Sequence, residues 1–131
     1  MAPQLSSTAE QASGEGGLLE RLLALYEEER QVYDRVLELS RQQGRIVQDG
    51  GSLAEVRRVL EQKKSCLDLI ARLELTERGS KAAWERGRPS WSPAGRAQLH
   101  TAICRVTALI EDILACEEEN DLEMIARTQV M

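Results

Sequence analysis

The chain has 131 residues, 42% of them hydrophobic, which is enough for one packed domain. Phe is absent and aromatic residues make up 3%, so Leu, Val, Ile and Ala must form the core. The formal net charge of −5 disfavours nucleic-acid binding, and no apolar run reaches the roughly 20 residues that span a bilayer.

Residues 1–17 predict a disordered arm, because Ser, Gln, Ala and Gly predominate there and three glycines oppose an early helix start. This stretch lacks the basic region and the following apolar segment of a secretory signal, so we do not expect it to be one. We therefore expect the ordered part of the chain to be a single helical domain over residues 18–131.

A first helix is expected over about residues 18–48. Polar residues interrupt its apolar seam at Glu29 and Gln43, and Gly44 weakens the last turn by about 1 kcal/mol relative to Ala. The seam steps by three and four residues, as in a coiled coil or a helix bundle, and comprises Leu18, Leu22, Leu25, Val32, Val36, Leu39 and Ile46.

A short turn and a second helix, over about residues 52–84, follow. Gly50 and Gly51 offer a left-handed helix end, and Ser52 with Glu55 forms a capping box of the S-x-x-E type. So short a turn makes the two helices antiparallel neighbours. Lys63 stands at one step of a seam that otherwise contains Leu53, Val56, Leu60, Leu67 and Ile70.

The stretch from Gly79 to Gly95 is rich in Gly and Pro and predicts an irregular link, with the second helix ending between Arg78 and Arg86. Trp84 and Trp91 lie in this link. Two interpretations stay open: the tryptophans close the end of the bundle, or they contact a partner protein.

A third helix is expected over about residues 93–127, with Ser92 as its N-cap and Pro93 in its first turn. Its apolar stripe includes Leu99, Ile103, Val106, Ile110 and Ile113. The predicted fold is all-α: an antiparallel three-helix bundle of long helices, built as a coiled-coil-like hairpin plus a C-terminal helix. Whether the third helix packs in the bundle or stays free is open.

No catalytic, cofactor-binding or metal site is predicted. His100 and Cys104 are four residues apart, a spacing that suits two metal ligands, but Cys116 lies too far along the helix to join them. The odd number of widely spaced cysteines indicates reduced thiols and a cytoplasmic location. The sequence therefore favours a protein-binding role over an enzyme, with no nucleic acid and no membrane insertion.

The chain resembles the FlgN family of flagellar export chaperones, which serve hook-associated proteins. The resemblance covers most of residues 18–75 and part of 99–124. It rests on the segments Leu18-Leu19-Glu20-Arg21-Leu22-Leu23, Tyr26-Glu27-Glu28-Glu29, the Asp49-Gly50 turn, Leu53-Ala54-Glu55-Val56, Glu61-Gln62-Lys63-Lys64, Ile70-Ala71-Arg72-Leu73-Glu74 and Glu117-Glu118-Glu119-Asn120-Asp121-Leu122.

The resemblance implies an ATP-independent chaperone that keeps an export substrate soluble and delivers it to a type III secretion apparatus. The predicted partners are a protein client, the export apparatus and, in a homodimer, a second copy. The client-binding residues are expected at Leu109, Ile110, Ile113, Leu114, Leu122, Ile125, Trp84 and Trp91. The alternative is a structural helical scaffold that pairs only with copies of itself.

Overall fold

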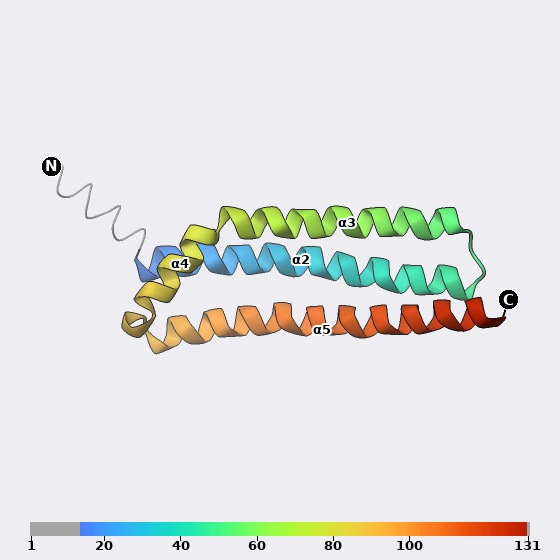
Figure 1. Cartoon of the computed structure of the whole chain (residues 1–131). Coiled ribbons are helices and arrows are strands. Elements are labelled where there is room, and N and C mark those ends of the chain that lie inside the picture. The colour runs from blue at the N-terminus through green and yellow to red at the C-terminus, as the bar shows by residue number, and fades with distance from the viewer. Residues whose placement is uncertain (1–13, 131) are drawn as a thin grey trace.

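The computed structural model describes residues 14–130, with side chains to residue 128, and this part of the chain is all-α (Figure 1). The all-α prediction is confirmed. The helices are α2 (Glu15–Gln48), α3 (Leu53–Thr76), α4 (Arg78–Gly87) and α5 (Pro93–Val130), and a 3-10 turn, η1 (Arg88–Ser90), precedes α5.

Helix α2 begins three residues before its expected start. The Glu15 carboxylate lies in its first turn, accepts a hydrogen bond from the Ser92 hydroxyl at 2.6 Å, and also accepts one from the Ser92 backbone N–H. Both bonds lower the pKa of Glu15 and join the start of α2 to the start of α5. Residues 1–13 of the expected arm lie outside the described residues.

The turn between α2 and α3 has the local structure that its residues predict. Gly50 adopts the left-handed conformation, with φ at 72°. Ser52 caps α3, and its hydroxyl oxygen accepts a hydrogen bond from the Glu55 N–H at 3.1 Å. The two helices run antiparallel, and the seam residues Leu22, Val36 and Leu39 are buried in α2.

The second helix ends earlier than expected. The helical path breaks at Glu77, so α3 stops at Thr76, and the Gly- and Pro-rich stretch folds as α4 and η1 instead of an irregular link. Burial of Trp84 explains why this short helix is held in place, since its exposed fraction is only 5%. Helix α4 crosses the end of α2 and carries the chain from α3 to α5 (Figure 1).

Helix α2 lies between α3 and α5 (Figure 1). It runs parallel to α5, since residues 15 and 40 contact residues 92 and 117. Within residues 14–130, no Cα atom of α3 lies within 8 Å of a Cα atom of α5. The helices therefore form an open arrangement around α2, in place of a bundle in which all three pack on one another.

Candidate functional site

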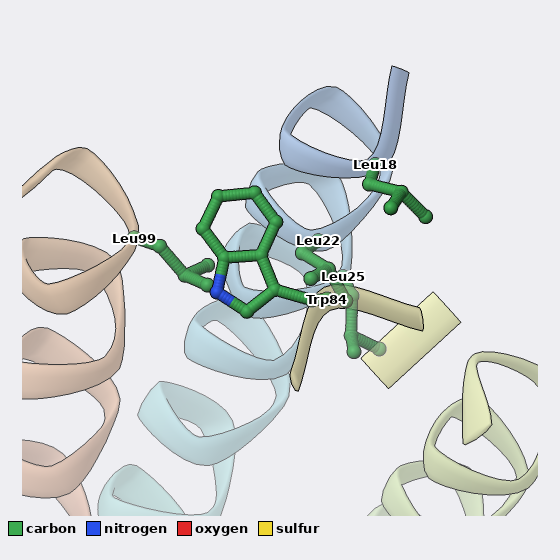
Figure 2. Packing of buried hydrophobic residues seen from close by; sticks show 5 residues of the cluster. All are labelled: Leu18, Leu22, Leu25, Trp84 and Leu99. Atoms are coloured by element: carbon green, nitrogen blue, oxygen red, sulfur yellow. The ribbon is translucent and has the colours of Figure 1, made fainter. Parts of the chain in front are cut away.

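At the end of the molecule where α4 lies, the space between α2 and α5 is filled. Trp84 of α4 packs with Leu18, Leu22 and Leu25 of α2 and Leu99 of α5 (Figure 2). The Trp91 indole stacks on Trp84 at a centroid distance of 5.2 Å and donates a hydrogen bond to the Trp84 carbonyl oxygen at 2.7 Å. The tryptophans thus close this end of the molecule.

The face of α2 that Trp84 covers continues toward the middle of the molecule. Leu22, Glu29 and Val36 are seven residues apart, so they follow one line along the helix. Helix α4 covers this line at Leu22, whereas Val36 forms the floor of an open groove between α3 and α5. The groove is therefore the uncovered continuation of the surface on which α4 packs.

The groove contains a hollow of about 340 Å³ with a mainly apolar lining. The floor comes from α2, one wall from α3 and the other from α5. The lining residues are Tyr33 and Val36 of α2, Lys63 and Leu67 of α3, and Ile110, Ile113, Leu114 and Glu117 of α5. Leu67 and Leu114 are 49% and 62% exposed, so both walls present apolar side chains to solvent.

Three leucines of α3 are exposed, although the sequence pattern placed them in the buried seam; Leu67 lines the first hollow, and Leu60 precedes it by seven residues on the same side of the helix. Leu53, Leu60 and Leu67 are 67%, 46% and 49% exposed. Within the described residues α3 packs along its length on α2 and touches α4 only at its end. The buried residues between Val56 and Ile70 therefore form a narrow row, and the leucine row lies at its edge.

A second hollow, of about 570 Å³, lies at the α2–α3 turn. Val47 contributes to it from α2, Leu53 and Val56 from α3, and Met124 from α5. Val47 follows Val36 by eleven residues, close to three helical turns, so both hollows lie on the same side of α2. The groove therefore extends along α2 in two apolar parts.

A polar network separates the two hollows and joins all three long helices. The Lys63 ammonium donates to the Gln43 side-chain oxygen at 3.0 Å and forms an ion pair with Glu117. The Ser40 hydroxyl also donates to Glu117, and the Asn120 amide donates to the Ser40 carbonyl oxygen at 2.8 Å. Gln43 and Lys63, which interrupt the two apolar seams, are thus paired with each other.

Gly44 lets α2 and α5 approach closely beside this network. A Cβ atom at residue 44 would lie 2.6 Å from the Asn120 side-chain oxygen. Asn120 is 6% exposed and depends on this space for its hydrogen bond to Ser40. The glycine therefore has a packing function in α2, which continues regularly to Gln48.

The other interruption of the α2 seam, Glu29, lies in a separate charged cluster beside α4. Its side chain is buried, and within the described residues one carboxylate oxygen has no hydrogen-bond partner. Burial and the neighbouring Glu74 carboxylate raise the pKa of Glu29 to about 8. Glu74 also forms an ion pair with Lys81 of α4, whose ammonium lies 5.3 Å from the Tyr26 ring centroid.

The structure brings three of the predicted client-binding residues together: Ile110, Ile113 and Leu114 line the first hollow. Leu109 is half-buried against the adjoining core of Val36 and Leu37. Leu122 and Ile125 are 60% and 53% exposed but line neither hollow. Trp84 is core, and Trp91 stacks on it, so neither lines the groove.

Sequence reasoning did not assign to a binding site the four residues that line the first hollow from α2 and α3: Tyr33, Val36, Lys63 and Leu67. One signal was present: Leu53, Leu60 and Leu67 repeat at seven residues, which marks a row that one neighbouring helix cannot bury together with Val56 and Ile70. The separation of α3 from α5 could not be deduced from that spacing.

The His100–Cys104 pair remains an isolated surface contact. The Cys104 sulfur lies 3.4 Å from the His100 Nε2, and both residues are exposed. Across residues 14–130, no group of three or more His, Cys, Asp or Glu side chains is placed to hold a metal ion. None of the described helices is both long and apolar enough to cross a membrane.

No protein-family model matches the chain, and no curated protein or solved structure matches it.

Proposed function

We propose that this protein binds an amphipathic α-helix of a partner protein in the groove between α3 and α5. The observation that carries this proposal is the apolar hollow floored by Val36, with Leu67 and Leu114 exposed on its walls. A docked helix would contact α3 on one side and α5 on the other. It would complete a four-helix bundle in which it lies diagonally opposite α2.

The end of the molecule near α4 supports this proposal. There, a helix already packs on the line of α2 that floors the groove, and Trp84 supplies its apolar anchor. A partner helix would continue that packing from Val36 toward Val47, over about 16 Å at the helical rise of 1.5 Å per residue. About three heptads of partner helix would cover both hollows.

The chain's own first 13 residues are unsuited to fill the groove. They contain Met1 and Leu5 as the only large apolar residues, so they cannot supply an apolar stripe at helical spacing. Residues 1–13 are therefore not the occupant that we propose.

For the cellular role, we propose an export chaperone of the FlgN type that shields an amphipathic helix of its client. The sequence resemblance across the α2–α3 hairpin supports this role, as does the position of Ile110, Ile113 and Leu114 in the groove. The cytoplasm, with a hook-associated or other export substrate as client, is the proposed setting.

The experiment that tests helix binding compares two double variants of the full chain. Leu67→Glu with Leu114→Glu places a charge on each groove wall, at side chains that are already exposed. Leu69→Glu with Leu122→Glu is the matched control, since both leucines are exposed and neither lines a hollow. Binding of a leucine-rich amphipathic peptide of about 21 residues is followed by calorimetry.

We expect the groove variant to weaken binding at least about tenfold while the control retains it. Equal binding by both variants would place the peptide elsewhere and refute the groove. For the export role, a coexpressed hook-associated protein should stay soluble with the control and precipitate with the groove variant. A tight homo-oligomer that dissociates in the groove variant would favour the scaffold alternative.

A further inference from the structure

The two walls of the groove carry opposite charges beside their exposed apolar residues. On α3, Arg57 and Lys64 lie three and four residues from Leu60, so they share its edge of the helix. On α5, Glu118 and Asp121 lie four and seven residues from Leu114 and border the other wall. All four charged residues are exposed.

These charges are available to a bound partner. Within residues 14–128, none of the four residues takes part in an ion pair, although ion pairs form elsewhere on each of the long helices. One ion pair, between Lys63 and Glu117, joins the two walls at the polar network, and within the described residues it does not involve the four exposed charges. The groove therefore has a basic wall and an acidic wall.

We infer that the occupant of the groove is a helix with one acidic and one basic flank, the acidic flank against α3 and the basic flank against α5. This inference rests on the proposed function and specifies the partner's surface. Complementary charges at the rim of an interface select partners and set orientation more than they add affinity. Here they would also fix the direction in which the partner helix runs.

Two other occupants fit the groove less well. Residues 1–13 contain one acidic side chain, Glu10, and no Lys or Arg, so they cannot supply a basic flank. In a dimer related by a two-fold axis, the walls of one copy would face the walls of the other. Both groove floors would then stay uncovered. A separate amphipathic helix fills the floor and meets both walls.

The test uses three synthetic peptides of about 21 residues with the same leucine stripe. The first has one acidic and one basic flank, the second has two acidic flanks, and the third has two basic flanks. We expect the first peptide to bind the full chain about tenfold more tightly than either of the others at low salt. Exchanging the two flanks would only reverse the direction of the helix, so that peptide is not informative.

A charge-reversal variant makes the test specific to the groove. Arg57→Glu with Lys64→Glu makes both walls acidic, so the preference should move to the peptide with two basic flanks. The matched control is Arg58→Glu with Arg72→Glu, which changes the net charge equally. Arg58 faces a hollow on the other side of α3, with Gln42 and Ile46, and Arg72 is exposed. Circular dichroism checks that both variants remain helical.

The outcomes separate this inference from the proposed function. All three peptides could bind equally well to the wild-type chain and weakly to the variant with Leu67→Glu and Leu114→Glu. That result would overturn the inference that wall charges select the partner, and it would leave the proposed helix binding intact. Absence of binding by every peptide would overturn both. A preference that moves equally in the Arg58/Arg72 control would show bulk charge rather than wall charge and would also overturn the inference. A dimer in sedimentation that dissociates when Leu60 and Leu67 become Glu would identify a second copy as the occupant.

Discussion

The two halves of the face between α3 and α5 differ in what covers α2. Near α4, Trp84 fills the space above Leu22 and reaches Leu99, whereas farther along α2 the apolar floor at Val36 is open. The same line of one helix is thus core in one half and groove in the other. The apolar surface of the open half therefore suits a helix, because α4 already covers its continuation.

Truncating a side chain to Ala should lower the free energy of unfolding by very different amounts in the two halves. Trp84→Ala removes a side chain that is 5% exposed, so we expect a loss of about 3–5 kcal/mol in the free energy of unfolding. Leu114→Ala, at 62% exposure, should cost less than about 1 kcal/mol. Urea denaturation measures both. Similar costs would mean that the open wall is packed in solution.

Removing one member of the polar network between the hollows should destabilise the fold, whereas replacing its ion pair with apolar residues should change stability little. Lys63→Leu leaves Glu117 and Gln43 without their shared cation, and we expect a loss of about 2–3 kcal/mol in the free energy of unfolding. Adding Glu117→Leu should recover most of that loss and join the two hollows into one apolar groove. Urea denaturation of the single and double variants tests this, and a double variant no more stable than Lys63→Leu would contradict it.

Protonation of Glu29 should stabilise the junction between the two halves at low pH. Its folded-state pKa of about 8 exceeds the ordinary value of 4.5, so its contribution is complete below pH 4.5 and is lost as the pH rises toward 8. Glu74, whose pKa is lowered, acts in the opposite sense and contributes above its ordinary pKa.

We expect the wild-type chain to lose about 2 kcal/mol of stability between about pH 5 and pH 8, while Glu29→Gln stays nearly constant. Urea denaturation at several pH values is the measurement. If Glu29→Gln lost stability with rising pH as the wild type does, Glu29 would not be the group responsible for the pH dependence.

The smallest change in stability is expected from Gly→Ala substitutions in α2. The space around each glycine decides whether the substitution stabilises or destabilises the fold. Gly44→Ala should destabilise by about 1 kcal/mol, because the new methyl group meets Asn120. Gly16→Ala is the control, since a Cβ there has no neighbour within 4 Å, and it should stabilise by about 0.5 kcal/mol. Thermal unfolding compares them, and a gain at both positions would show that α2 and α5 are less closely packed.

The parts of the fold that local chemistry decides could be predicted from the sequence. The turn at Gly50 and the cap at Ser52 depend on residues within one helical turn. The break at Glu77 could not be predicted, because no Gly or Pro stands there and burial of the distant Trp84 holds α4 in place. The separation of α3 from α5 is likewise a property of tertiary packing.

The candidate site was only partly predictable for the same reason. Periodicity assigns residues to a helix face but does not give the number of neighbouring helices, so Leu53, Leu60 and Leu67 were expected to be buried and are exposed. Ile110 and Leu114 were expected as client-binding residues by analogy with the export chaperones that the sequence resembles, and both line the groove. The polar interruptions at Gln43 and Lys63 marked the network without revealing that Glu117 completes it.

The most direct test of the groove is to map a bound helix by NMR chemical-shift perturbation. On titration with the peptide that has one acidic and one basic flank, the amide resonances of Leu67, Ile110 and Leu114 should shift most, together with Val36 beneath them. Resonances of Leu69 and Trp84 should stay nearly unchanged. Shifts confined to the outer face of α3 around Leu69, with none at Leu114, would contradict binding in the groove.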